Sequence, residues 1–351
     1  MTEASCTVPA PESFQTVGQA LALAGQLLAN AGIPSPAAEA ALLVSSISGL
    51  PHAALALAST TRLTARQRYR LRVLTLARVE ERIPLQYLLG SAPFYGLELK
   101  VGPGVFIPRP ETEGLVELVL ARLPQGPVQV ADLGTGSGAI ALAIKSQRPD
   151  VTVHATDLSP QALSFARRNA RRLGLEVQFH LGDGYAGLTS LFHAILSNPP
   201  YLPQAEIKTL APELFFEPLP ALTPGGDGLD VIRRIISGAP ERLVNSGFLA
   251  LEIHPPLAGA VQQLLLDAGL QGIEILPDLT GRERYAAAVS GCASGAPEAH
   301  PLTSAPGPRC KAPLQEGNES VENGAQKRHD HNAGVHGRVV KGVAAVANKQ
   351  S

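Results

Sequence analysis

The chain has 351 residues, 45% of them hydrophobic and 17% charged, so it can bury a sizeable core in two or three domains. Its 29 basic and 30 acidic residues leave a net charge of −1, which excludes a generally basic nucleic-acid coat protein but not a local basic patch. Three cysteines are too few for a disulfide framework, the acidic start is unlike a signal peptide, and no apolar run reaches the ~20 residues of a membrane span. We therefore expect a soluble, reduced, cytoplasmic protein with no membrane partner.

Composition and periodicity divide the chain into five parts. We expect residues 1–12 to be a disordered N-terminus and residues 13–85, with apolar residues at helical spacing, to form a helical bundle. Residues 86–109 are punctuated by Gly and Pro and predict a β-hairpin linker. Residues 110–290 alternate short strands with helices, which predicts an α/β domain with a mostly parallel sheet. Residues 291–351 contain no aromatic residue and are predicted to be a disordered, low-complexity tail.

Three longer helices are expected in the bundle. The first ends at Gly32, the second follows Ser35 as a candidate N-cap with Pro in the first turn, and the third runs from a Thr64 cap to Glu81. Charged residues of the third helix and its flanks are mostly basic. We interpret them as a solvated face, with docking to an acidic partner as the alternative. These residues are Arg62, Arg66, Arg68, Arg70, Arg72, Arg78 and Arg82.

Seven strands are predicted in the α/β part, and a further helix is expected to open at Pro110–Glu113. The strands are residues 128–133, 151–157, 176–183, 192–198, 247–253, 272–276 and 284–289. Ligands of such sheets bind at the carboxyl ends of the strands, where the polar residues of this chain are found.

A glycine-rich loop follows the first strand. It consists of Gly134, Thr135, Gly136, Ser137 and Gly138, and an apolar helix comes directly after it. Glycines at alternate positions allow a tight turn and a close approach of a ligand to the backbone. The third Gly comes one residue too early for a dinucleotide loop, and no basic residue is nearby to meet phosphate. The loop therefore favours a nucleoside-type ligand without phosphates, with a ligand-free strand–helix turn as the alternative.

Two acidic residues end the next two strands. The carboxylate of Asp157 can accept hydrogen bonds from both ribose hydroxyls, although a helix N-cap also fits its sequence. Asp183 could reach an adenine edge, or it could serve as an ordinary turn residue.

The tetrad Asn198-Pro199-Pro200-Tyr201 follows the fourth strand. Two consecutive prolines fix the backbone and remove two donors, while Asn198 adds a side-chain carbonyl and Tyr201 a flat ring. Two oxygen acceptors could hold both hydrogens of a planar NH2 group and leave the nitrogen lone pair facing a methyl donor. We interpret Asn198, Pro199 and Tyr201 as catalytic and the whole tetrad as substrate-binding.

The loop, Asp157 and the tetrad together resemble class I S-adenosylmethionine-dependent methyltransferases that act on planar nitrogens. The flanks narrow the resemblance to the release factor glutamine methyltransferases (the HemK/PrmC type). They are Glu81–Gly90, Phe94–Leu97, Phe106–Glu113, Glu217-Pro218 with Ala221-Leu222, and Gly225–Leu229. The similarity covers roughly residues 15–290.

The resemblance implies a seven-stranded, Rossmann-like class I methyltransferase fold with a helical substrate-docking domain at residues 13–85. It implies that S-adenosylmethionine is held by residues 134–138, Asp157, Asp183, Gly184 and Asn198. The substrate would be the glutamine of the Gly-Gly-Gln motif in peptide chain release factors, methylated at N5. Separately, we expect a monomer, and the balanced charge predicts no direct nucleic-acid partner. The chain departs from the family at His193, at His254 and after Asp183, where Tyr185 could replace an aromatic residue against the adenine. We interpret both histidines as structural or solvated.

Other functions remain compatible with the residues alone. A base amine of adenine or guanine is also a planar NH2 group, and a ribosomal-protein glutamine would need only a different docking domain. A non-catalytic donor-binding module is a third alternative. No metal is expected, because the tail's potential ligands match no common spacing. These are His300, His329, His331, His336, Cys292 and Cys310.

Overall fold

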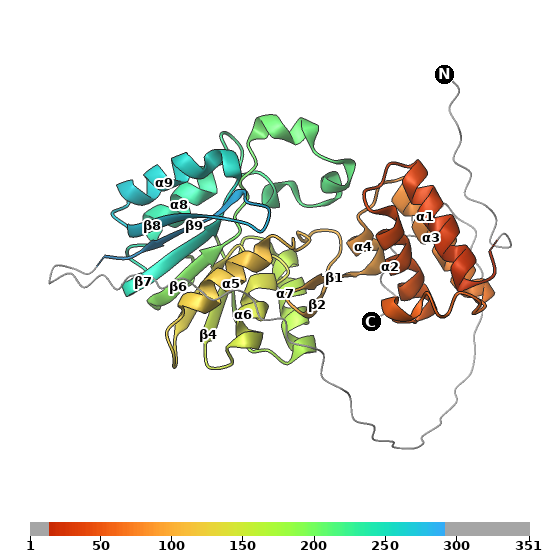
Figure 1. Cartoon of the computed structure of the whole chain (residues 1–351). Coiled ribbons are helices and arrows are strands. Elements are labelled where there is room, and N and C mark those ends of the chain that lie inside the picture. The colour runs from red at the N-terminus through yellow and green to blue at the C-terminus, as the bar shows by residue number, and fades with distance from the viewer. Residues whose placement is uncertain (1–13, 292–351) are drawn as a thin grey trace, which may run out of the picture. The chain divides into compact units, whose positions relative to one another are not determined.

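The computed structural model describes residues 14–291 (Figure 1). The expectations for residues 1–12, and for the tail from residue 292 onward, lie outside this described part. Within it, no helix is both long and apolar enough to cross a membrane.

The N-terminal part of the described chain is helical, as predicted. Thr16 and Thr64 each begin a helix with a capping box, since each side chain accepts a hydrogen bond from the backbone of a Gln three residues later while that Gln reaches back. Ser35 does occupy the N-cap position before α2, but its backbone is left-handed and its side chain makes no capping bond. The helices are α1 (Val17–Asn30), α2 (Pro36–Ser48), η2 (His52–Ala54), α3 (Ala65–Val79) and α4 (Leu85–Leu89).

The interpretation of the arginines as a solvated face is wrong for two of them. Arg78 is only 4% exposed, and it pairs with Glu39 at 2.7 Å and with Glu213 at 2.7 Å. Arg82 also contacts Glu213 at 2.7 Å and donates to the Ala31 carbonyl. These acidic partners lie far away in sequence, so the local charge pattern of the helix could not reveal them.

A short antiparallel hairpin follows α4, with strands β1 (Ser91–Phe94) and β2 (Leu97–Lys100). Tyr95 and Gly96 form its turn, and both have positive φ. The expected hairpin is therefore present, although the first residues of the predicted linker belong to α4. The helix expected at Pro110–Glu113 is α5 (Thr112–Arg122), which begins slightly later.

Within residues 14–291, seven strands form the main sheet in the order β5-β4-β3-β6-β7-β9-β8. The first five in this order are parallel to their neighbours, and β9 runs antiparallel to both β7 and β8. This confirms the predicted class I methyltransferase fold. The strands are β3 (Gln129–Leu133), β4 (Thr152–Asp157), β5 (Gln178–Leu181), β6 (Phe192–Ser197), β7 (Leu243–Glu252), β8 (Gln271–Pro277) and β9 (Glu283–Val289).

Helices cover both faces of the sheet (Figure 1). Alternate strand residues point into two separate apolar cores: Val130 packs with α5, α6 (Ala139–Gln147) and α7 (Pro160–Leu173), whereas Ala131 packs with α8 (Asp230–Gly238) and α9 (Ala258–Asp267). The central strands are therefore buried on both faces, as residues 130–133 of β3 and 194–197 of β6 show. Between β6 and α8 the chain forms three 3-10 turns, η3 (Gln204–Thr209), η4 (Pro212–Phe216) and η5 (Leu219–Ala221), and η6 (Pro255–Leu257) follows β7.

Candidate active site

A cavity of about 740 Å³ lies at the carboxyl ends of the parallel strands. Its size is typical of a site for a small molecule or cofactor. Most of the predicted site residues line it, and they come from loops that follow β3, β4, β5 and β6. These residues are Gly134, Thr135, Gly136, Ser137, Asp157, Asp183, Gly184, Asn198, Pro199 and Pro200. The structure thus brings together on one cavity the residues that follow separate strands in the sequence.

The glycine loop forms one wall of this cavity. All three glycines have positive φ, and a Cβ on Gly134 or Gly136 would meet nothing within 4 Å, so the backbone there faces open space. Gly138 does not line the cavity; its Cβ would lie 3.0 Å from Leu142 and 3.3 Å from Ala166, so it allows the loop to pack on the helices behind it. The loop therefore leaves room for a ligand to approach its backbone.

Asp132, which the sequence analysis did not single out, is hydrogen-bonded to this loop and to the helix after it. Its Oδ2 accepts hydrogen bonds from Thr135 Oγ1 at 2.6 Å and from Ala141 N at 3.1 Å. The side chain is fully buried, and burial raises the pKa of the Asp132 carboxyl to about 7 against the opposing effect of those two hydrogen bonds. A polar residue in a buried strand, directly before the glycines, was the available signal.

Asp157 lies at the end of β4 and faces the loop. Its two oxygens accept hydrogen bonds from Gly136 N and Ser159 N, both at 2.8 Å. Burial raises the pKa of this carboxyl, and the two backbone donors oppose that shift. Ser159, not Asp157, caps α7, because the Ser159 side chain accepts from Ala162 N. The N-cap alternative for Asp157 is therefore wrong, and its remaining lone pairs are available at the cavity.

The third strand end contributes a more exposed group. Asp183 lines the cavity and lies 3.5 Å from Arg234, while Gly184 accepts a hydrogen bond from Thr156 through its carbonyl. Tyr185 also lines the cavity, and its hydroxyl donates to the Ile235 carbonyl at 2.6 Å. Arg242, a second basic lining residue, donates to the Leu188 carbonyl.

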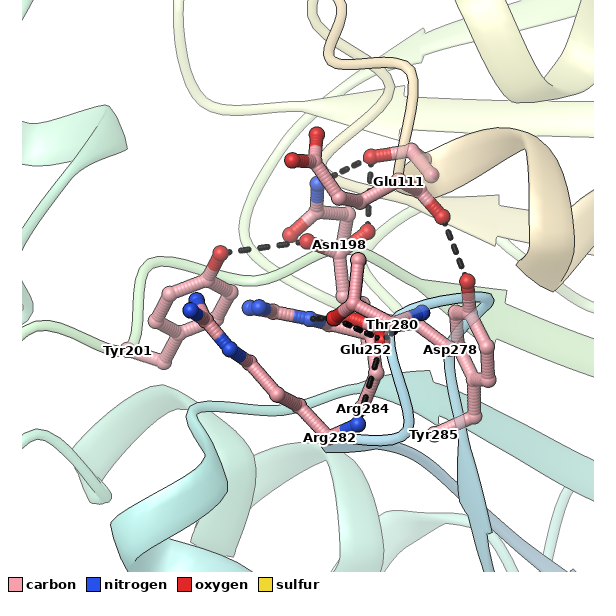
Figure 2. Close-up of polar contacts among 10 residues, drawn as sticks. Glu111, Asn198, Tyr201, Glu252, Asp278, Thr280, Arg282, Arg284 and Tyr285 are labelled. Carbon is pink, nitrogen blue, oxygen red and sulfur yellow. Dashed lines mark hydrogen bonds and ion pairs between the residues drawn. The ribbon is translucent and has the colours of Figure 1, made fainter.

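The tetrad contributes a further edge of the cavity. Asn198, Pro199 and Pro200 line it, whereas Tyr201 does not and its hydroxyl lies 3.1 Å from Glu252 Oε1. Asn198 donates through Nδ2 to Thr112 Oγ1 at 2.9 Å. Figure 2 shows Asn198 and Tyr201 beside the carboxylate of Glu252. Sequence reasoning found the tetrad but neither Thr112 nor Glu252 as parts of the site.

A second pair of segments is joined close to the cavity. The buried Glu217 accepts a hydrogen bond from Ile107 N at 2.9 Å and forms an ion pair with Arg109, whose guanidinium lies 4.5 Å from the centre of the Phe106 ring. Phe106, Pro108 and Pro218, which flank these groups, line the cavity. These contacts of Glu217 therefore connect two loops that form one rim of the cavity.

Both histidines that depart from the family have structural partners, as interpreted. His193 accepts a hydrogen bond from Gln129 N at 3.1 Å, and His254 lies 3.2 Å from Glu206 and stacks on Tyr201 with ring centres 5.9 Å apart. Among residues 14–291, no cluster of His, Cys, Asp or Glu has the arrangement of a metal site.

The cavity fits S-adenosylmethionine. A carboxylate at the end of β4 suits the ribose hydroxyls, and the open backbone at Gly134 and Gly136 suits close contact with a nucleoside. The two arginines that line the cavity already have protein partners, Asp183 for Arg234 and the Leu188 carbonyl for Arg242. We propose that Gly134, Gly136 and Asp157 would hold the nucleoside and that Asp183 and Gly184 would lie at its adenine end.

Comparison with known proteins gives a consistent result. Residues 19–90 match a family described as PrmC N-terminal domain, and residues 96–236 match one described as methyltransferase small domain. The chain is 43% identical to the release factor glutamine methyltransferase of Deinococcus radiodurans, over 74% of this chain and 92% of that protein. It is 44% identical to the same-named protein of Gloeobacter violaceus, over 74% and 93%, and 40% identical to that of Cereibacter sphaeroides, over 77% and 96%.

Proposed function

The chain belongs to the family of release factor glutamine methyltransferases, and we propose that the tetrad edge of its cavity is where the methyl group is transferred. The protein is a methyltransferase that uses S-adenosylmethionine as methyl donor and a glutamine of a peptide chain release factor as acceptor. The observation that carries the site assignment is the position of Asn198 and Pro199 on the same cavity as the glycine loop and Asp157.

The chemistry that we assign to the tetrad is the capture of an amide nitrogen. S-adenosylmethionine, when bound, supplies an electrophilic methyl group on its sulfonium sulfur. The side-chain oxygen of Asn198 and the carbonyl oxygen of Pro199 accept one hydrogen bond each from the glutamine NH2 group. This arrangement turns the nitrogen lone pair toward the donor, and the nitrogen releases a proton after it has been methylated.

Proximity and orientation contribute to the rate in this scheme. Holding two reactants in a reactive geometry lowers a barrier by as much as about 7–11 kcal/mol in favourable cases. Partial negative charge on the two acceptor oxygens favours the developing positive charge on the nitrogen. No general base is required before transfer, because the nitrogen loses its proton only after it has been methylated.

The finer features of the substrate remain proposals. We propose that the acceptor is the N5 atom of the glutamine in the Gly-Gly-Gln motif, that residues 13–85 dock the release factor, and that the enzyme acts as a monomer in the cytoplasm without nucleic acid. The domain match at residues 19–90 and the balanced net charge of −1 support these proposals. Base methylation and ribosomal-protein methylation are not favoured by the names of the relatives.

The direct test is transfer of tritium from labelled S-adenosylmethionine to purified release factor. We expect one label per release factor and none on the same factor with Gln→Ala in its Gly-Gly-Gln motif. Label that persists on the altered factor would refute the substrate assignment. Ribosomal proteins and duplex DNA, offered separately at the same concentration, should remain unlabelled.

A further inference from the structure

A chain of hydrogen bonds connects the tetrad to two buried residues that its sequence motif does not contain. Asn198 Nδ2 donates to Thr112 Oγ1 at 2.9 Å, and Thr112 Oγ1 donates to Glu252 Oε2 at 2.6 Å. Tyr201 donates to the other oxygen of the same carboxylate at 3.1 Å (Figure 2). The chain therefore joins the first residue of α5, the end of β7 and the loop after β6.

The direction of this chain determines which way the Asn198 amide faces. Glu252 in its ionised form only accepts hydrogen bonds, so Thr112 uses its single hydrogen to reach Glu252. The Thr112 oxygen then has only lone pairs to offer to Asn198, and these require the amide NH2 group. The amide oxygen of Asn198 is consequently left for another partner, and Asn198 lines the cavity.

The energetic cost of this arrangement is large enough to need an explanation. Glu252 is 1% exposed and Thr112 is 3% exposed, so a carboxylate is buried where water cannot solvate it. Burial raises the pKa of Glu252, while the donors Thr112 and Tyr201 and the positive charge of Arg284 act against the shift. The negative charge of Glu111 raises the pKa of Glu252 further. A neutral apolar residue in place of Glu252 would avoid this cost, but it would not fix the orientation of the Thr112 hydroxyl and the Asn198 amide.

We propose that Thr112 and Glu252 are positioning residues that lock the amide of Asn198 with its oxygen, not its nitrogen, presented to the acceptor glutamine. The proposal rests on the proposed function of Asn198. An amide turned by 180° would present an NH2 group to the NH2 group of the substrate, and neither could accept the other's hydrogens. Tyr201, bonded to the same carboxylate, is fixed by the same device.

Thr112→Val tests the proposal, because it keeps the shape of the side chain and removes the hydroxyl. We expect kcat with release factor to fall about 10- to 100-fold, the effect expected of a misoriented reactant, while the KM for release factor changes by less than about threefold. Binding of S-adenosylmethionine, measured by calorimetry without substrate, should stay close to wild type. Thr112→Ser, which restores the hydroxyl, should recover most of the lost kcat.

A matched control removes a neighbouring hydrogen bond that is not part of the series from Asn198 through Thr112 to Glu252. Tyr285 faces Glu252 across β7 and β9 and donates to the Glu111 carbonyl at 2.6 Å. Tyr285→Phe should lower the unfolding temperature, as Thr112→Val does, but leave kcat near the wild-type value. Equal losses of kcat in Tyr285→Phe and Thr112→Val, or a Ser variant as slow as the Val variant, would overturn the proposal.

A double variant separates the failure of this proposal from failure of the proposed function. If Thr112 acts through Asn198, then Thr112→Val should cost no further activity in an Asn198→Ala background, measured by single-turnover transfer. Additive losses would overturn the positioning role. If Asn198→Ala alone kept full activity, the proposed function of the tetrad would fail first, and the positioning role would fail with it.

Discussion

We propose the most direct role among the individual residues for Asn198, because it is the side chain of the tetrad that can place an amide oxygen at the cavity. We expect Asn198→Ala to reduce methyl transfer by at least about 100-fold, the usual loss when one aligned polar group is removed from a transition state. S-adenosylmethionine affinity should fall only modestly, since the glycine loop and Asp157 remain. Single-turnover transfer and calorimetric titration measure the two effects separately. Transfer at more than half of the wild-type rate would contradict the assignment.

Asp132 gives a prediction about pH and stability. Its pKa is raised from 3.8 to about 7 in the folded protein. At pH values between these two, the folded state keeps a proton that the unfolded state has lost. Stability from this group is therefore greatest at low pH and declines as pH rises from about 4 to about 7, by up to about 1.4 kcal/mol per pH unit.

Urea unfolding between pH 5 and pH 8 measures this slope. Asp132→Asn should flatten it, and the remaining slope includes Asp157, whose pKa is shifted in the same direction. A variant whose stability follows the same pH profile as the wild type would show that Asp132 does not titrate as described. Thr135→Val, which removes one of the opposing hydrogen bonds, should extend the decline in stability to higher pH.

The sequence revealed those site residues that follow strands directly. Asp157 and Asn198 each end an apolar run, and the rule that parallel strands end at one edge of a sheet is enough to predict that the two residues lie together. Thr112 and Glu252 could not be found in this way. They lie 140 positions apart in the chain, and their contact depends on how α5 packs against β7. Glu217 and Arg109 were visible as motifs, but their pairing was not.

Among the elements, the loop from Gly225 to Gly228 supports the tetrad by close backbone contact. A Cβ on Gly228 would lie 2.4 Å from the Tyr201 carbonyl oxygen, and the residue has a φ of +88°. We expect Gly228→Ala to lower the free energy of unfolding by about 1–3 kcal/mol and to reduce kcat, because the tetrad must shift to admit the methyl group.

Gly126→Ala is the matched control for this prediction. Gly126 has a φ of +90°, but a Cβ there would meet nothing within 4 Å. It should therefore lose stability from backbone strain without losing kcat. Denaturant unfolding and steady-state transfer on both variants distinguish the two effects. A Gly228→Ala enzyme with normal kcat would mean that the loop does not position the tetrad.

The elements themselves were predicted well where a local signal defined them. All seven strands were found, because buried apolar runs alternate with helical periodicity, and Thr64 was identified as a cap from its neighbours alone. The prediction was less successful where tertiary contacts decide. α4 occupies the first residues of the expected linker, and Ser35 begins α2 without using its hydroxyl.

At the scale of the whole molecule, every residue that we assign to the site lies between positions 134 and 201 or in contact with that part. We therefore predict that the chain ending at residue 291 keeps the kcat and the S-adenosylmethionine affinity of the full chain. Steady-state transfer to release factor with both forms measures this. A loss of more than about tenfold in kcat would place part of the active machinery beyond residue 291.

Arg78 shows what the charge pattern of the sequence alone cannot reveal about the whole molecule. A row of arginines with two nearby glutamates has the pattern of a solvated helix. In the structure Arg78 is buried between Glu39 of α2 and Glu213 of η4, so it connects three segments that are distant in sequence. Such a residue can be recognised only when the partners that neutralise its charge are known.

The buried Asn169 of α7 has a consequence for how the molecule can respond to its protein substrate. Its side chain accepts from Lys100 N, donates to the Lys100 carbonyl and donates to the Ser137 carbonyl, at 2.7, 3.0 and 2.9 Å. One amide thus links the hairpin, which directly follows the N-terminal helices in the chain, to Ser137 of the glycine loop. We therefore expect that a partner that displaced the hairpin would also remove the support that Asn169 gives to the glycine loop.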